Sequence, residues 1–120
     1  MVKKRVLIVD DDVGILELLK IALENDYTVD SCEDETDLKI AISRNKPDII
    51  LLDASIPGID GISMCRGLKR SDVTSGIPII VITAYSDDRT KHDAYFFGAD
   101  DFISKPFDVK DLKNRIESLI

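Results

Sequence analysis

Short apolar runs alternate with amphipathic stretches along the whole chain. Several of the runs are continuous in Val, Ile and Leu, as is typical of strands that are buried on both faces of a sheet. The second run is less apolar, which favours a place near the sheet edge. The expected strands are Arg5–Val9, Thr28–Ser31, Asp48–Leu52, Ile77–Ile82 and Asp101–Ser104.

The stretches between these runs repeat apolar residues at the spacing of a helix face. Asp12 can cap a first helix that starts at Val13, and Pro47 follows the end of a second helix over Thr36–Asn45. The residues expected to face the core are Ile15, Leu18, Leu19, Ala22 and Leu23 in the first helix, Leu38, Ala41 and Ile42 in the second, and Val109, Leu112, Ile116 and Leu119 in the last.

Gly, Pro and small polar residues predict the remaining boundaries. Ser86 can cap a fourth helix that ends at Gly98. Pro57-Gly58 and Asp60-Gly61 predict a loop before a third helix that begins with Ile62–Leu68, and Thr74-Ser75-Gly76 predicts a turn.

Five strand–helix units in 120 residues predict an α/β fold with a doubly wound parallel sheet. This length suits one domain with one core, which we expect to cover residues 1–120. We find no linker, repeat or low-complexity segment, and we expect no output domain within this sequence.

The net charge and the length of the apolar runs limit the kinds of partner that this domain can bind. The net charge of −7 argues against a domain that grips nucleic acid or an anionic membrane by itself. No apolar run approaches the roughly 20 residues of a membrane span, and the basic start, Met1–Arg5, precedes too short an apolar run for a signal peptide. A cytoplasmic protein is expected, with Cys32 and Cys65 reduced and packed in the core.

Polar residues follow the ends of four predicted strands: Asp10 and Asp11, Asp53, Thr83 and Lys105. In an open parallel sheet, ligands bind at the carboxyl ends of the strands. Three carboxylates, a hydroxyl and an ammonium are therefore expected in one crevice. Such a set can hold a divalent cation and transfer a phosphoryl group to a carboxylate.

Each of these residues alone has an ordinary explanation. Paired aspartates at a strand-to-helix turn often just cap the helix, but Asp12 already suffices as the cap. A strand-end aspartate such as Asp53 is often a turn residue, and a strand-end lysine is usually solvated. The joint occurrence at successive strand ends is what indicates a site.

These motifs resemble those of bacterial two-component response-regulator receiver domains, including the chemotaxis response regulators. The resemblance covers essentially the whole chain. It rests on Val6–Asp12, on Leu52-Asp53 with Pro57–Gly61, on Val81–Ala84, and on Gly98–Phe107.

The resemblance implies a flavodoxin-like fold with five parallel strands in the order 2-1-3-4-5. It implies that Asp53 accepts a phosphoryl group from the phosphohistidine of a histidine kinase or phosphotransfer domain, while Thr83 and Lys105 bind the phosphoryl oxygens. Mg²⁺ would be held by Asp10, Asp11, Asp53 and the backbone carbonyl of Ser55. Phe102 would be the switch aromatic that moves with Thr83, and the Lys105–Pro106 bond is often cis in the family.

Tyr95-Phe96-Phe97 lie near the end of the fourth helix. Three consecutive residues span about 200° of the helix circumference, so they cannot all enter one core. They are either broadly buried or exposed by chance, or they form a contact patch on the face made by the fourth helix, the fifth strand and the last helix. Relatives use that face to bind effectors or a second copy.

Two rival functions remain open. A magnesium-dependent phosphatase of the haloacid dehalogenase type also uses an aspartyl nucleophile, but it needs a second aspartate where this chain has Ser55. A degenerate interaction module that is not phosphorylated would not need all five polar residues. The leading interpretation is a phosphorylation-dependent switch that is not itself an enzyme.

Overall fold

The computed structural model describes residues 2–54, 60–85 and 87–120. Five parallel strands form one sheet in the order β2-β1-β3-β4-β5, as the family resemblance implied. The strands are β1 (Arg5–Val9), β2 (Thr28–Cys32), β3 (Ile49–Asp53), β4 (Ile79–Thr83) and β5 (Asp101–Ser104).

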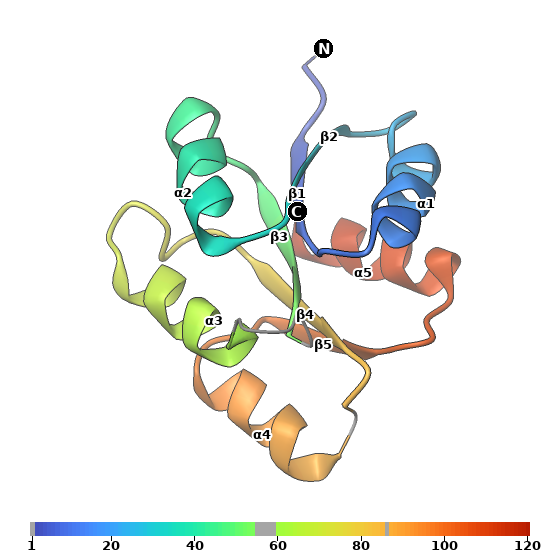
Figure 1. Cartoon of the computed structure of the whole chain (residues 1–120). Coiled ribbons are helices and arrows are strands. Elements are labelled where there is room, and N and C mark those ends of the chain that lie inside the picture. The colour runs from blue at the N-terminus through green and yellow to red at the C-terminus, as the bar shows by residue number, and fades with distance from the viewer. Residues whose placement is uncertain (1, 55–59, 86) are drawn as a thin grey trace.

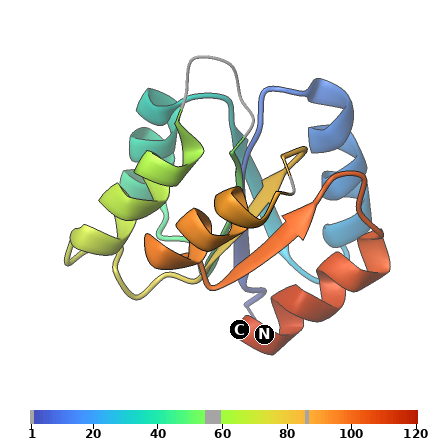
Figure 2. The same cartoon turned by 90° about the horizontal axis from the view of Figure 1, so that it is seen from below.

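Helices cover both faces of the sheet (Figures 1 and 2), with α1 and α5 on one face and α2, α3 and α4 on the other. The helices are α1 (Val13–Leu23), α2 (Glu35–Arg44), α3 (Gly61–Arg70), α4 (Asp88–Phe96) and α5 (Val109–Leu119). No helix within the described residues is long and apolar enough to cross a membrane.

The core has two halves, because successive side chains of a strand point to opposite faces of the sheet. On β1, Val6 and Ile8 pack towards α1 and α5, whereas Leu7 and Val9 pack towards α2, α3 and α4. Strands β3 and β4 are buried along their whole length, as their continuous apolar runs predicted.

An aspartate caps the N-terminus of every helix in the described part of the chain: Asp12, Asp34, Asp60, Asp87 and Asp108. Each carboxylate accepts a hydrogen bond from a backbone N–H of the first turn, an arrangement worth about 1 kcal/mol per helix. The cap predicted at Asp12 is confirmed. The prediction that Ser86 caps the fourth helix was wrong, because Asp87 does so.

Two other sequence predictions were wrong. Leu18 does not face the core, since its side chain lies on the outer face of α1 and is 51 % exposed. Asp60-Gly61 is not part of a loop, because Asp60 is the cap of α3 and Gly61 its first residue. Most other boundaries are within one residue of the prediction, although β4 begins at Ile79 rather than Ile77.

Gly98 ends α4 as predicted. Its φ of +106° lies in the left-handed region that glycine adopts readily. The N–H of Gly98 donates to the carbonyl of Tyr95, and the N–H of Ala99 donates to that of Ala94. This pair of bonds is the Schellman motif, which satisfies the last carbonyls of a helix.

Candidate functional site

The predicted site residues meet at the carboxyl ends of the central strands. Val9 of β1 lies beside Leu52 of β3, so Asp10 and Asp53 extend from neighbouring strands. Both carboxylates are buried, with Asp10 3 % and Asp53 4 % exposed. Asp10 is further held because one of its oxygens accepts a 3.0 Å hydrogen bond from the backbone N–H of Asp12.

Asp11 completes a cluster of three carboxylates. One carboxylate oxygen from each of Asp10, Asp11 and Asp53 lies within 4.8 Å of the others. Asp11 is exposed, whereas its two neighbours are buried, so the cluster opens to solvent on the side of Asp11. Oxygen donors at this spacing fit a hard divalent cation that retains some of its waters.

Lys105 brings a positive charge to the same cluster. Its Nζ lies 2.7 Å from an Asp53 oxygen and 3.4 Å from an Asp10 oxygen. The backbone of Lys105 is fixed because its N–H donates to the carbonyl of Thr83 at 2.8 Å. The Lys105–Pro106 peptide bond is cis, as the resemblance implied.

Thr83 ends β4 next to this cluster and is fully buried. Its register partner on β5 is Ser104, and Ile82 pairs with Asp53. The Thr83 hydroxyl oxygen accepts a 3.0 Å hydrogen bond from the N–H of Tyr85, which orients the side chain.

Phe102 lies on β5 opposite Val81 of β4. It is 5 % exposed and belongs to the half of the core that faces α2, α3 and α4. Phe102 is therefore two strand positions from Thr83, on the adjacent strand.

The charges of the cluster are not balanced. Burial raises the pKa of Asp10 from its ordinary 3.8 to about 6, and the charge of Asp53 adds to this effect, while the Asp12 N–H and Lys105 oppose it. For Lys105, burial alone would lower the pKa, but the hydrogen bond and charge of Asp53 and the charge of Asp10 raise it overall. Among the described residues, the ammonium of Lys105 pairs with the two buried carboxylates Asp10 and Asp53, and Asp11 adds a third carboxylate to the cluster. A further cation would relieve the repulsion among the carboxylates.

Two features of the site were not predicted. The backbone N–H of Asp12 donates to the Asp10 carboxylate, which is an Asx turn that aspartate favours, so the residue type at position 10 was the available signal. Gly61 lies so close to the strand end that a Cβ there would be 2.4 Å from Cα of Ala54. The Asp60-Gly61 pair was the available signal, but it suggested a turn rather than close packing.

Some predictions fall outside the described residues. Ser55, whose carbonyl was expected to bind the metal, is one of them, as are Pro57, Gly58 and Ile59. The other five predicted site residues lie together at one end of the sheet, and Phe102 lies in the core beneath them.

The aromatic residues at the end of α4 do not share one face. Tyr95 is 43 % exposed and reaches towards Asp101 of β5, whereas Phe96 is 73 % exposed at the crest of the helix. Phe97 turns to α3, where the guanidinium of Arg66 lies 5.4 Å from its ring centre. Of the three rings, only Tyr95 is seen to contact β5 in the described part of the chain, through Asp101, and that this face binds a partner stays a prediction.

Known proteins are similar to this chain in sequence and in fold. The chain matches the response regulator receiver domain family over residues 6–117. It is 40 % identical over its full length to the phosphate regulon transcriptional regulatory protein PhoB of Pseudomonas aeruginosa, covering 53 % of that protein. It is 38 % identical over 97 % of its length to the DNA-binding response regulator MtrA of Mycobacterium tuberculosis, covering 50 % of it.

A solved structure has a closely similar fold. The CheY-like response regulator receiver domain protein of Methanospirillum hungatei has a TM-score of 0.83 and 30 % identity, with 98 % of this chain and 94 % of that chain covered. The chain spans about half the length of the curated relatives that it matches. It belongs to the receiver domains of two-component response regulators, which signal through phosphorylation.

Proposed function

We propose that Asp53 is the residue of this receiver domain that accepts the phosphoryl group, from the phosphohistidine of a sensor kinase or a histidine phosphotransfer domain. The observation that supports this most directly is the Asp53 carboxylate itself. It is buried among Asp10 and Asp11, with the Lys105 ammonium 2.7 Å away. Asp10 is also buried in this cluster, but Lys105 lies farther from it, at 3.4 Å.

The chemistry needs little more than these groups. An Asp53 oxygen attacks phosphorus, the new P–O bond forms as the P–N bond breaks, and the histidine nitrogen leaves with the electron pair. Negative charge on the phosphoryl oxygens rises at a place where Asp10 and Asp11 already repel it. Lys105, now on Asp53, is within reach to pair with a phosphoryl oxygen after transfer.

The donor set explains how this repulsion is overcome. Receiver domains bind a divalent metal, and the oxygens of Asp10, Asp11 and Asp53 suit one. A bound cation supplies the positive charge that lets the carboxylates and the phosphoryl group lie together. We assign it as Mg²⁺, which binds to a few carboxylates and keeps its other waters, with the carbonyl of Ser55 as a further ligand by family resemblance.

The switch follows from the position of Thr83. Its hydroxyl can turn from Tyr85 to a phosphoryl oxygen on Asp53, and this movement would open space towards Phe102. Phe102 then changes its packing, and the surface of α4, β5 and α5 changes with it. The phosphoryl group thus acts as a ligand that favours one of two arrangements.

Two surfaces suit protein partners. Next to the site, the outer face of α1 exposes Val13, Leu18 and Ile21, which suits a kinase that must reach Asp53. On the other side, Arg115 of α5 pairs with Asp101 at 2.7 Å and with Asp111 at 3.1 Å. These charges and Tyr95 make the α4–β5–α5 face suitable for a second copy or an effector.

The remaining functional assignments rest on the family. We place the protein in the cytoplasm and treat residues 1–120 as one receiver domain that promotes only its own phosphotransfer and dephosphorylation. The DNA-binding named for the relative MtrA is a property of that whole protein. The charge of −7 supports a domain that does not bind nucleic acid by itself.

Intact-mass measurement with acetyl phosphate tests the proposal. The wild type and the control Asp72→Asn, which changes an exposed aspartate outside the carboxylate cluster, should gain one phosphoryl group in the presence of Mg²⁺. Asp53→Asn should gain none, and a chelator should prevent the gain in the wild type and in Asp72→Asn. Full phosphorylation of Asp53→Asn, or of the wild type in chelator, would refute the assignment.

A further inference from the structure

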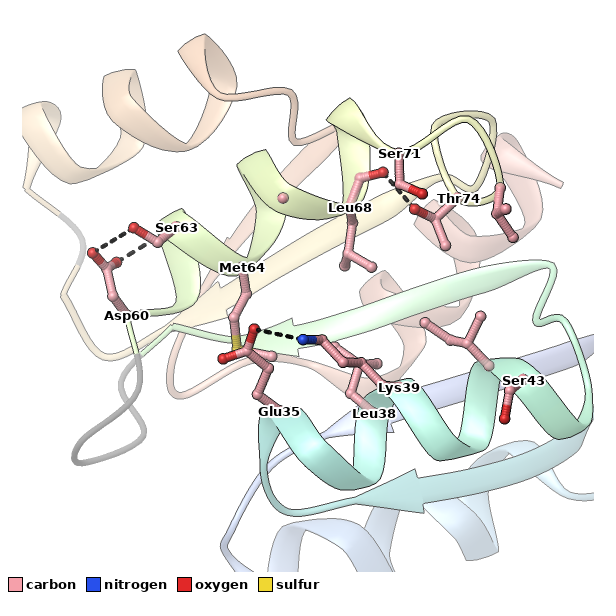
Figure 3. A pocket seen from close by; sticks show the side chains of 13 residues that line it. Glu35, Leu38, Lys39, Ser43, Asp60, Ser63, Met64, Leu68, Ser71 and Thr74 are labelled. Carbon is pink, nitrogen blue, oxygen red and sulfur yellow. Dashed lines mark hydrogen bonds and ion pairs between the residues drawn. The ribbon is translucent and has the colours of Figure 1, made fainter.

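A groove lies between α2 and α3, on the face of the sheet opposite α1 and α5 (Figure 3). Its volume is about 730 Å³, which is within the range of about 300–1,000 Å³ that is usual for small-molecule sites. The floor is apolar and is formed by Leu38 and Ile42 of α2 and by Met64 and Leu68 of α3. The functional site does not use it.

Gly67 leaves the wall of the groove formed by α3 without a side chain at one position. It lies in the middle of α3, where glycine is less stabilising than alanine by roughly 1 kcal/mol. A Cβ at this position would meet no atom within 4 Å, so packing within the domain does not require glycine. Because Gly67 lines the groove, its lack of a side chain leaves room for a ligand to lie against the helix backbone.

Charge distinguishes the two ends of the groove. Glu35 and Asp60 lie at the end where α2 and α3 begin, whereas Ser43, Ser71 and Thr74 lie at the other end (Figure 3). Lys39 also lines the groove, but its ammonium is 3.8 Å from Glu35 and both side chains are largely exposed. The Asp60 carboxylate accepts hydrogen bonds from Ser63 and from the backbone N–H of Ile62, but it pairs with no cation among the described residues. At this end of the groove two carboxylates therefore lie near one ammonium.

We propose that this groove is a ligand site for an amphipathic organic cation, with an apolar body over Gly67 and an ammonium near Glu35 and Asp60. The apolar floor favours the body, and the two carboxylates favour the ammonium over an anionic group. The net charge of −7 favours a cationic ligand further.

The place of the groove gives such a ligand access to the switch. Asp60 caps α3 at the groove end, and the next residue, Gly61, packs directly on Ala54, the neighbour of Asp53. A ligand at Asp60 therefore lies against the helix whose first turn touches the end of β3. Binding itself does not depend on the proposed phosphorylation, so the two proposals can fail separately.

NMR titration with two matched probes tests the proposal. Tryptamine carries an indole and an ammonium, and indole-3-propionate carries the same ring with a carboxylate. Tryptamine should shift the methyl signals of Leu38, Met64 and Leu68 with saturation near the millimolar range expected for such a small ligand. Indole-3-propionate should bind several-fold more weakly.

Variants test where the probe binds and whether the groove prefers a cationic probe. Gly67→Leu should fill the groove and abolish the saturable shifts, whereas Ser118→Leu, which adds the same side chain to an exposed position of α5, should leave them unchanged. Glu35→Gln should reduce the preference for tryptamine over indole-3-propionate at least twofold, and the charge-matched Glu17→Gln on α1 should not.

Several results would overturn the proposal. They are an absence of saturable shifts, equal or tighter binding of the anionic probe, and shifts that persist unchanged in Gly67→Leu. Groove signals that depend on protein concentration without any probe would show instead that a second copy occupies the groove.

Discussion

Two lysine–aspartate pairs lie at opposite ends of the sheet, and they differ in what surrounds them. At the amino end of β4, Lys69 of α3 bonds to Asp100 at 2.9 Å and to the carbonyl of Ile77 at 2.8 Å. Asp100 also accepts the N–H of Ile79 at 2.8 Å. One ammonium meets one carboxylate, and backbone groups satisfy the rest.

At the carboxyl ends of the strands, Lys105 bonds to Asp53 at 2.7 Å, a distance similar to that of the first pair. Here, however, Asp10 and Asp11 add two more carboxylates. The same pair of residue types therefore stabilises the fold where the charges balance, at Lys69 and Asp100. Where the charges do not balance, it lies in the proposed cation and phosphoryl site.

Removing each lysine in turn should give the largest difference between the two lysine–aspartate pairs, measured as the free energy of unfolding with and without Mg²⁺. Lys69→Ala should lower the free energy of unfolding by about 1–2 kcal/mol, because Asp100 loses its cation, and Mg²⁺ should not restore this loss. Lys105→Ala should lower it by about 2–3 kcal/mol in chelator, since buried carboxylates lose their ammonium. Mg²⁺ should restore much of that stability.

Urea unfolding of both variants, with chelator and with Mg²⁺, measures these differences. Equal rescue of both variants by Mg²⁺ would mean that the metal does not act at the carboxylate cluster.

The next largest effect is expected in the pH dependence of the stability of the metal-free protein. The pKa of Asp10 is raised from 3.8 to about 6 in the fold, so the folded protein binds more protons than the unfolded chain between these values. The stabilisation is fully present below pH 4 and is lost as the pH rises through 6. We expect a fall of about 2 kcal/mol across this window relative to Asp10→Asn.

Unfolding curves in chelator between pH 4 and 7 test this, with Asp10→Asn as the reference for all other groups. Parallel pH profiles for the two proteins would show that Asp10 does not hold an extra proton.

Substitution of the two adjacent aspartates, Asp11 and Asp12, should then distinguish a metal ligand from a helix cap. Asp11→Asn and Asp12→Asn each remove one negative charge beside the site. Asparagine caps helices as well as aspartate does, so Asp12→Asn should leave the structure and most of the Mg²⁺ affinity intact. Asp11→Asn removes a ligand and should weaken Mg²⁺ binding roughly tenfold, or about 1.4 kcal/mol.

Calorimetric Mg²⁺ titration compares the two variants. Equal losses of affinity would indicate that only the local charge matters and that Asp11 is not a ligand.

Local signals were sufficient for the strands and for the doubly wound α/β class, whereas the strand order came from the family resemblance. Continuous apolar runs predicted β1, β3 and β4, and polar residues after those runs identified Asp10, Asp53 and Thr83, since strand ends meet at one edge. Helix boundaries were less certain where two capping residues compete. Ser86 and Asp87 are both good caps, and only the chain path decides between them.

Features that depend on tertiary contact could not be predicted in this way. Leu18 has helical spacing with Ile15 and Ala22, but its side chain stays exposed. The groove beside Gly67 requires the separation of α2 and α3, which no single helix encodes. The imbalance of charge around Lys105 requires the distances between three strands.

NMR spectra of the Mg²⁺-bound protein with and without beryllofluoride, a phosphoryl mimic, test the central contrast most directly. We predict shifts around Asp53, Thr83 and Lys105 that extend through Phe102 to α5, while the amides of Lys69 and Asp100 change little. Shifts confined to the immediate surroundings of Asp53, or equally large at Lys69 and Asp100, would contradict an account in which one end switches and the other holds the fold.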